Sequence, residues 1–209
     1  MTDNPEERQQ YKVEAERTVF TYVRLMQASS HALEDGNARE EGSFYEWMTA
    51  GVFAAFSLEA YLNHLGPRRF QCWDELERLS VEAKLSLILE DLKQQPDFSR
   101  RPFQTVRDVL RFRNQLALGR TQLVKETSIQ KLLPRERPRY PELPWESQCT
   151  KEAAQRFASD VCAVISQLHT WAGLDGLSLF SPETGSRTVA PIEQARPQGE
   201  SGRKRSARK

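Results

Sequence analysis

The 209-residue chain holds enough apolar material for one principal domain, since hydrophobic residues make up 38% and charged residues 28% of it. With 30 Lys and Arg against 29 Asp and Glu, the formal charge is only +1. Overall charge therefore neither favours nor excludes a nucleic-acid partner. No run of about 18 apolar residues occurs, and the first ten residues are polar and acidic, unlike a secretory signal. We therefore expect a cytoplasmic protein.

The cysteines and histidines are few and scattered. The chain has 3 of each, with no CxxC pair and no spacing typical of a zinc site. This pattern predicts free or buried thiols in a reducing compartment. It predicts no metal site and no cofactor.

Helical signals divide the first 180 residues into five segments. The second segment begins at Ser43 with Glu46 three residues later, a capping box, and Gly66-Pro67 is expected to end it. It is apolar nearly all round, so we expect it to be the central helix. Ser80 could start a new helix within the third segment, and Thr150 is a candidate N-cap for the last. The sequence predicts helices over residues 5–32, 43–65, 72–95, 99–118 and 150–171.

The remaining segments differ in composition. Residues 134–144 contain four prolines, which excludes a regular helix there. Residues 181–209 are rich in Pro, Gly, Ser, Arg and Glu, and are expected to form a disordered basic tail that solubilises the chain or touches RNA. We find no sustained two-residue alternation and so predict no sheet. The expected fold is all-α, a five- or six-helix bundle over residues 1–180.

Two charged residues lie within apolar helix faces. Glu59 shares a face with Leu62 on the second helix, and Arg113 shares a face with Leu116 on the fourth. An unpaired buried ion costs several kcal/mol. One hypothesis is that Glu59 and Arg113 form an ion pair across the bundle. The alternative is that each side chain reaches solvent at the edge of its face.

The fourth helix also carries a basic face. Residues 100–120 contain six arginines and one acid. Arg107 and Arg111 are four apart and share one side of the helix with Leu118. A solvated helix surface is one interpretation. The other is a phosphate-binding surface formed by Arg107, Arg111 and Arg120, because guanidinium groups bind phosphate in a bidentate manner.

The segment Arg-Asn-Gln-Leu-Ala-Leu-Gly at residues 113–119 resembles the signature of HEPN domains. That signature is an Arg, a polar residue that is often Asn, three further residues and then a His. Arg113 and Asn114 match it, and Gly119 matches the glycine that follows. Leu118 stands where the family has its His.

Neighbouring segments extend this resemblance. Residues 57–64 are similar to the second helix of bacterial HEPN-like proteins of unassigned role. Residues 84–85 and 101–105 also resemble members of that subgroup. The resemblance covers about residues 44–121.

The resemblance implies a helical bundle that forms a homodimer, and in many members a metal-independent endoribonuclease active in toxin or defence systems. Arg113 would hold the scissile phosphate, Asn114 would support it and Glu59 would orient Arg113. Leu118 can neither accept nor donate a proton, so the acid–base step loses its agent. The expected function is therefore a catalytically impaired module that acts by binding or assembly, with RNA, an antitoxin or another protein as partner.

Two alternatives remain open at this point. The first is an active endoribonuclease in which Arg113 works with a substitute base such as His64. The second is a scaffold or antitoxin-like partner with no role in RNA binding.

Overall fold

The computed structural model describes residues 10–39, 41–135 and 137–191. It divides into two units, a helical unit over Val19–Glu183 and a second unit that contains a β-ribbon. The helical unit contains α1 (Thr21–Asn37), α2 (Phe44–Arg69), α3 (Trp73–Leu76), α4 (Val81–Asp91), α5 (Phe103–Ala117) and α6 (Lys151–Trp171), with 3-10 turns η1 (Glu146–Gln148) and η2 (Gly176–Leu179). The described part of the chain is therefore mostly helical.

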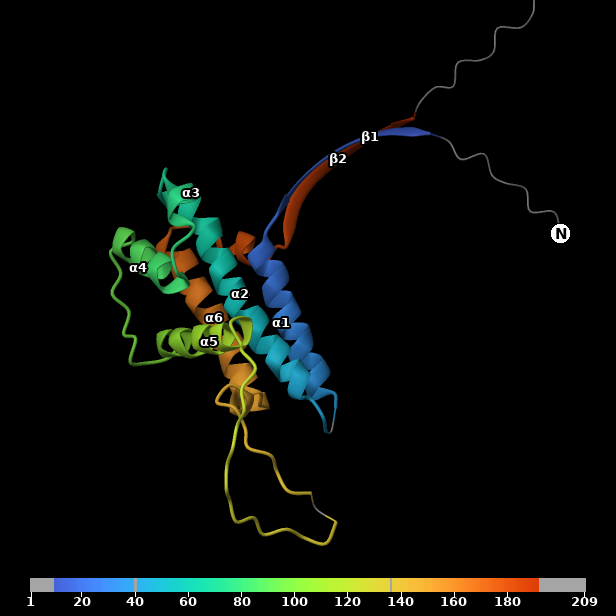
Figure 1. Ribbon diagram of the computed structural model, residues 1–209. Coiled ribbons are helices and arrows are strands. Elements are labelled where there is room, and N and C mark those ends of the chain that lie inside the picture. Colours follow the sequence, from blue (N-terminus) through green and yellow to red (C-terminus); the bar gives the residue numbers. More distant parts are fainter. Residues whose placement is uncertain (1–9, 40, 136, 192–209) are drawn as a thin grey trace, which may run out of the picture. The chain divides into compact units, whose positions relative to one another are not determined.

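The prediction that the second helix is central is confirmed. α2 packs against α1, α4, α5 and α6, and Figure 1 shows it running between α1 and the other helices of the unit. Its fully buried residues meet apolar faces of α4, α5 and α6 in one continuous core. The largest of these buried side chains include Leu58, Tyr61, Leu62, Ile88, Leu110, Phe157 and Ile165. Burial of such side chains from water stabilises the bundle.

The helix starts predicted at Ser43, Ser80 and Thr150 are confirmed, and the last two carry capping hydrogen bonds. The Ser80 hydroxyl accepts from the Ala83 N–H at 3.2 Å, and the Thr150 hydroxyl accepts from the Ala153 N–H at 3.3 Å. Each bond satisfies an N–H group that has no partner within its helix. The third predicted segment is split accordingly into α3 and α4.

The capping box predicted at Ser43 is wrong. The Ser43 side chain makes no capping bond, and its hydroxyl donates instead to the Gly36 carbonyl at 2.9 Å. Glu46 pairs with Arg39 at 2.6 Å. Both residues therefore stabilise the turn between α1 and α2. These contacts replace the capping hydrogen bonds that we expected between Ser43 and Glu46.

The predicted end of the second helix is also wrong, because α2 continues through Pro67 to Arg69. Proline removes one backbone N–H, and here it does so only in the last turn, which the Phe70 N–H closes onto the Gly66 carbonyl at 2.8 Å. Gly66 is buried against the indole of Trp73. Its missing side chain leaves room for that ring.

Replacement of Gly66 by alanine should therefore destabilise the bundle although alanine favours helices. The new Cβ would overlap the fused ring atoms of Trp73, and overpacking of this kind costs about 1–3 kcal/mol. Urea unfolding measures the loss. Gly176→Ala is the matched control, because a Cβ there meets nothing within 4 Å. Equal stability of the two variants would contradict the prediction.

The second unit corrects three predictions. β1 (Tyr11–Val19) and β2 (Glu183–Pro191) pair in a two-stranded sheet, where we predicted a helix from residue 5, no sheet and a disordered tail from residue 181. Every residue of β1 is exposed, so backbone pairing rather than a buried face holds the ribbon. Residues 192–209 of the predicted tail, and residues 5–9, lie outside the described residues.

One long irregular segment separates α5 from η1. We call residues 123–142 the arm; within its described residues it contains no helix or strand. Figure 1 shows it projecting from the end of the bundle where α6 begins. The helices that the structure describes include none with both the length and the apolar character needed to cross a membrane.

Candidate functional site

A surface cavity of about 1000 Å³ lies between α5 and the two ends of the arm. One wall is α5 itself, and Glu82 of α4 lies at its edge. The other walls are the residues just before and just after the arm, so segments separated by twenty positions meet here. The lining residues are Glu82, Arg107, Arg111, Asn114, Gln115, Leu118, Gly119, Arg120, Thr121, Gln122, Leu143, Pro144 and Trp145.

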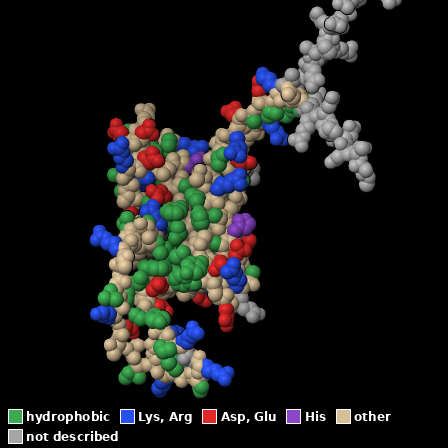
Figure 2. Space-filling model, turned by 45° about the vertical axis from the view of Figure 1, so that its right-hand side comes forward, with side chains coloured by type: hydrophobic (Ala, Val, Ile, Leu, Met, Phe, Trp, Pro, Cys, Tyr) green, Lys and Arg blue, Asp and Glu red, His purple; other side chains and the backbone are tan. Residues whose placement is uncertain are grey.

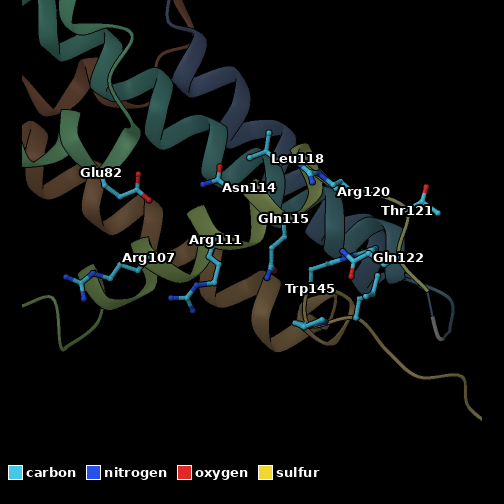
Figure 3. A pocket seen from close by; sticks show the side chains of 13 residues that line it. Glu82, Arg107, Arg111, Asn114, Gln115, Leu118, Arg120, Thr121, Gln122 and Trp145 are labelled. Atoms are coloured by element: carbon cyan, nitrogen blue, oxygen red, sulfur yellow. The ribbon is translucent and has the colours of Figure 1, made fainter. Parts of the chain in front are cut away.

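The structure brings the three predicted phosphate-binding arginines together in this cavity. Arg107, Arg111 and Arg120 all line it, and Figure 3 shows Arg107 and Arg111 extending from the same side of α5. The Arg107 guanidinium stacks over the Phe98 ring at 5.6 Å from its centroid. The Arg111 side chain is 67% exposed and 4.0 Å from Asp108, a contact too long and too solvated to fix it. These cations are therefore positioned to receive an anion.

Sequence reasoning missed the aromatic wall of the cavity. Trp145 is half-buried, with its ring 6.2 Å from that of Phe44, and it faces the cavity from beyond the arm. Gln115 also lines the cavity, and its Oε1 is buried without a hydrogen-bond partner among the described residues. Gln115 lies one turn after Arg111 and could have been found from that spacing. Trp145 carried no such signal, because only the fold returns the chain to α5.

The predicted pairing of Glu59 with Arg113 is confirmed. Arg113 Nη2 donates to a Glu59 carboxylate oxygen, and Nη1 donates to Asn114 Oδ1 at 2.9 Å. The guanidinium also stacks over Phe56, 5.5 Å from the ring centroid. Arg113 and Glu59 do not belong to the residues that line the cavity, whereas Asn114 does. Asn114 thus links the ion pair to the cavity wall.

A second cation completes this cluster, and sequence reasoning missed it. Lys84 of α4 has a side chain only 2% exposed; its Nζ donates to Asn63 Oδ1 at 3.0 Å and lies 3.7 Å from Glu59 Oε1. One carboxylate therefore faces two cations. The signal was available, because Lys84 follows Val81 by three positions and precedes Ile88 by four, inside the apolar stripe of α4.

His64, the suggested substitute base, lies in another environment. Its ring is 5.4 Å from Phe20 and 5.0 Å from Tyr22, between centroids, and its Nε2 is 2.7 Å from Arg68 Nη1. Burial first, and then the charge of Arg68, lower the pKa of His64 to about 4. His64 is not among the residues that line the cavity. The structure therefore does not bring it to the predicted motif.

Leu118 lies where the cavity meets the end of α5. It caps the helix through its own N–H, which donates to the Asn114 carbonyl at 3.0 Å, and its side chain is 76% exposed. An aliphatic side chain offers no proton to a ligand in the cavity. In the residues that the structure describes, no group of three or more His, Cys, Asp or Glu could hold a metal ion.

The fold and the site together define a mostly helical protein with an arginine-lined surface cavity beside a Lys–Glu–Arg cluster. Comparison with protein-family models, curated proteins and solved structures gives no significant match to this chain.

Proposed function

We propose that this chain is a HEPN-like module that binds RNA in the arginine-lined cavity and does not cleave it. The observation that carries the proposal is the cavity itself, which Arg107, Arg111 and Arg120 all line together with Leu118. The resemblance gives Leu118 the position of the family's histidine. The cavity therefore offers groups that bind phosphate, while Leu118 offers none that transfers a proton.

The geometry suits a nucleic-acid strand. Arg107 and Arg111 are one helical turn apart, about 6 Å along the axis, so they can hold two successive phosphates. Guanidinium forks bind phosphate oxygens in pairs. Trp145 supplies an aromatic face on which a base can stack, an interaction worth about 1–3 kcal/mol per base. Arginines on α5 and a tryptophan beyond the arm therefore match the backbone and the base of a single strand.

The motif has no general acid or base for RNA cleavage. Attack of a ribose 2′-hydroxyl on phosphate needs a group that removes or supplies protons, and such a group contributes about 100- to 10,000-fold in rate. Leu118 cannot do so. Two Arg113 nitrogens are already engaged by Glu59 and Asn114, so the role of Arg113 here is to hold Asn114 at the cavity wall.

The double variant Arg107→Glu/Arg111→Glu tests the binding site. We expect its affinity for a fluorescently labelled single-stranded RNA to fall at least tenfold in anisotropy titrations. The loss of two phosphate contacts should also reduce the slope of log K against log salt by about 1.4.

The control is Arg78→Glu/Lys93→Glu, which makes the same change in net charge outside the cavity. An equal loss in both variants would mean that RNA responds to overall charge alone. Unchanged affinity in the cavity variant would mean that the cavity is not an RNA site, and would favour a scaffold without a role in RNA binding.

A further inference from the structure

The arm exposes large apolar side chains that the helical unit does not cover. Leu123 is 82%, Ile129 100% and Tyr140 90% exposed. Apolar exposure on this scale, concentrated in one segment, is typical of a surface that meets another protein. Aliphatic side chains such as Leu123 and Ile129 offer no face on which a nucleic-acid base can stack. The arm is therefore suited to a protein partner.

Hydrogen bonds join two distant positions of the arm. The Gln130 side chain spans its two halves: Oε1 accepts from the Arg139 N–H at 2.9 Å, and Nε2 donates to the Arg139 carbonyl at 3.1 Å. The Gln130 side-chain amide thus binds both the backbone N–H and the backbone carbonyl of Arg139, as a residue of a neighbouring strand would. A segment held in this way loses less conformational entropy on binding than a free loop does.

The helical unit carries an apolar surface of its own. On one side of α2, Val52, Phe53 and Phe56 are only half-buried, and Tyr45 is 69% exposed at the start of the same helix. The Arg113 guanidinium covers part of the Phe56 ring. The helical period places these four residues on one face. Figure 2 shows hydrophobic side chains gathered in the middle of the helical unit. We call this face of α2 the stripe.

The charges around the two surfaces are complementary. The arm carries five Lys and Arg against three acids. Residues 34–46 span the last turn of α1, the connection to α2 and the first turn of α2. They carry five acids against one Arg, and we call them the acidic end. Figure 2 shows basic side chains mixed with hydrophobic ones at the end of the unit from which the arm projects. The same chain therefore carries a basic apolar arm and an apolar stripe with an acidic segment beside it.

We propose that the arm of one copy packs on the stripe of a second copy, so that two arms are exchanged in a symmetric dimer. Ten extended residues reach about 33 Å, enough for the arm to leave its own bundle. A twofold axis makes both contacts identical. A stable interface uses about 20–30 residues on each side, which one arm together with one stripe provides. This proposal does not depend on RNA binding.

A charge exchange tests the proposal. We expect the natural protein to sediment as a dimer, and Lys131→Glu/Arg139→Glu on the arm to weaken the dimer at least tenfold. Glu34→Lys/Glu41→Lys at the acidic end should weaken it similarly. An equimolar mixture of the two variants should dimerise again, because each reversed arm then meets a reversed acidic end and each natural arm meets a natural one.

Analytical ultracentrifugation gives the masses, and circular dichroism checks that each variant is folded. Arg78→Glu/Lys93→Glu is the matched control and should remain dimeric. A monomeric natural protein at 50 μM would overturn the proposal, and an arm packed on its own chain would give that result. So would a mixture of reversed variants that associates no better than either alone, or a Leu123→Ser/Ile129→Ser variant that keeps the full dimer affinity.

Discussion

Ribonuclease activity that depends on Arg113 is expected to appear when Leu118 is replaced by histidine. Position 118 lies on the cavity wall, is 76% exposed and closes the last turn of α5. A histidine there can reach a ligand, and the negative end of the helix dipole favours its protonated form. Acid–base catalysis by this histidine should contribute about 100- to 10,000-fold in rate.

The measurement is cleavage of a labelled single-stranded RNA in EDTA by the natural protein, Leu118→His and Leu118→Gln. Glutamine is the matched control, because it is polar and similar in size but does not titrate. Each protein is also prepared with Arg113→Lys, which keeps a cation beside Glu59 and loses the planar fork. Products ending in a 2′,3′-cyclic phosphate identify attack by the ribose hydroxyl.

Two results would contradict this prediction. Cleavage by the natural protein that Arg113→Lys abolishes would show that the chain is an active enzyme, and His64 would then be the next residue to replace. If Leu118→His binds RNA as tightly as the natural protein but remains inert, the end of α5 lacks the catalytic arrangement that the HEPN signature implies.

Local periodicity predicted the parts of the fold that depend on neighbouring residues. α6 was expected over residues 150–171 and runs over Lys151–Trp171, because Thr150 caps it and one apolar face continues along it. The pair of Glu59 and Arg113 was expected for a related reason. A charge inside an apolar stripe needs a partner, and only a few such charges were available to one another.

The elements that were predicted wrongly depend on contacts between residues far apart in the sequence. Tyr11, Val13 and Ala15 alternate with polar residues, which is a weak strand signal on its own. The partner of β1 is β2, which follows the whole helical unit in the sequence. Gly185 allows that pairing, because a Cβ there would overlap the Glu16 carbonyl. A local pattern could not predict β1, because its hydrogen-bond partner β2 lies near the other end of the chain.

The residues of the candidate site also divide into those that the sequence predicts and those that it does not. Arg107 and Arg111 were predicted together because both lie on one face of a single helix. Trp145 could not be, because it joins them only after the arm has returned to α5. Lys84 was within reach of sequence reasoning, yet its role depends on Glu59, which lies on another helix. Side chains that share a helix face are predictable from their spacing. Those on different helices were predictable only where each is a charge inside an apolar face, as Glu59 and Arg113 are.

Glu59→Ala is expected to cause the largest loss of stability of any single substitution in the cluster. It leaves the Lys84 ammonium buried without a counter-ion and removes the partner of Arg113. Removal of one partner from a fully buried pair costs about 3–5 kcal/mol. Because Glu59 is 29% and Arg113 21% exposed, solvent screens part of this loss, and we expect about 2–3 kcal/mol. The melting temperature should fall by roughly 5–10 °C.

Lys84→Met separates the buried charge from the packing around it. Methionine fills a similar volume, and Glu59 keeps Arg113, so we expect stability within about 1 kcal/mol of the natural protein. The double variant Glu59→Ala/Lys84→Met should then be more stable than Glu59→Ala alone, because the stranded ammonium is gone. Calorimetry and urea unfolding measure both, with the exposed Glu90→Ala as control. If the double variant were no more stable than Glu59→Ala, Glu59 would act through Arg113 alone, and Asn63 would suffice to hold Lys84 in the core.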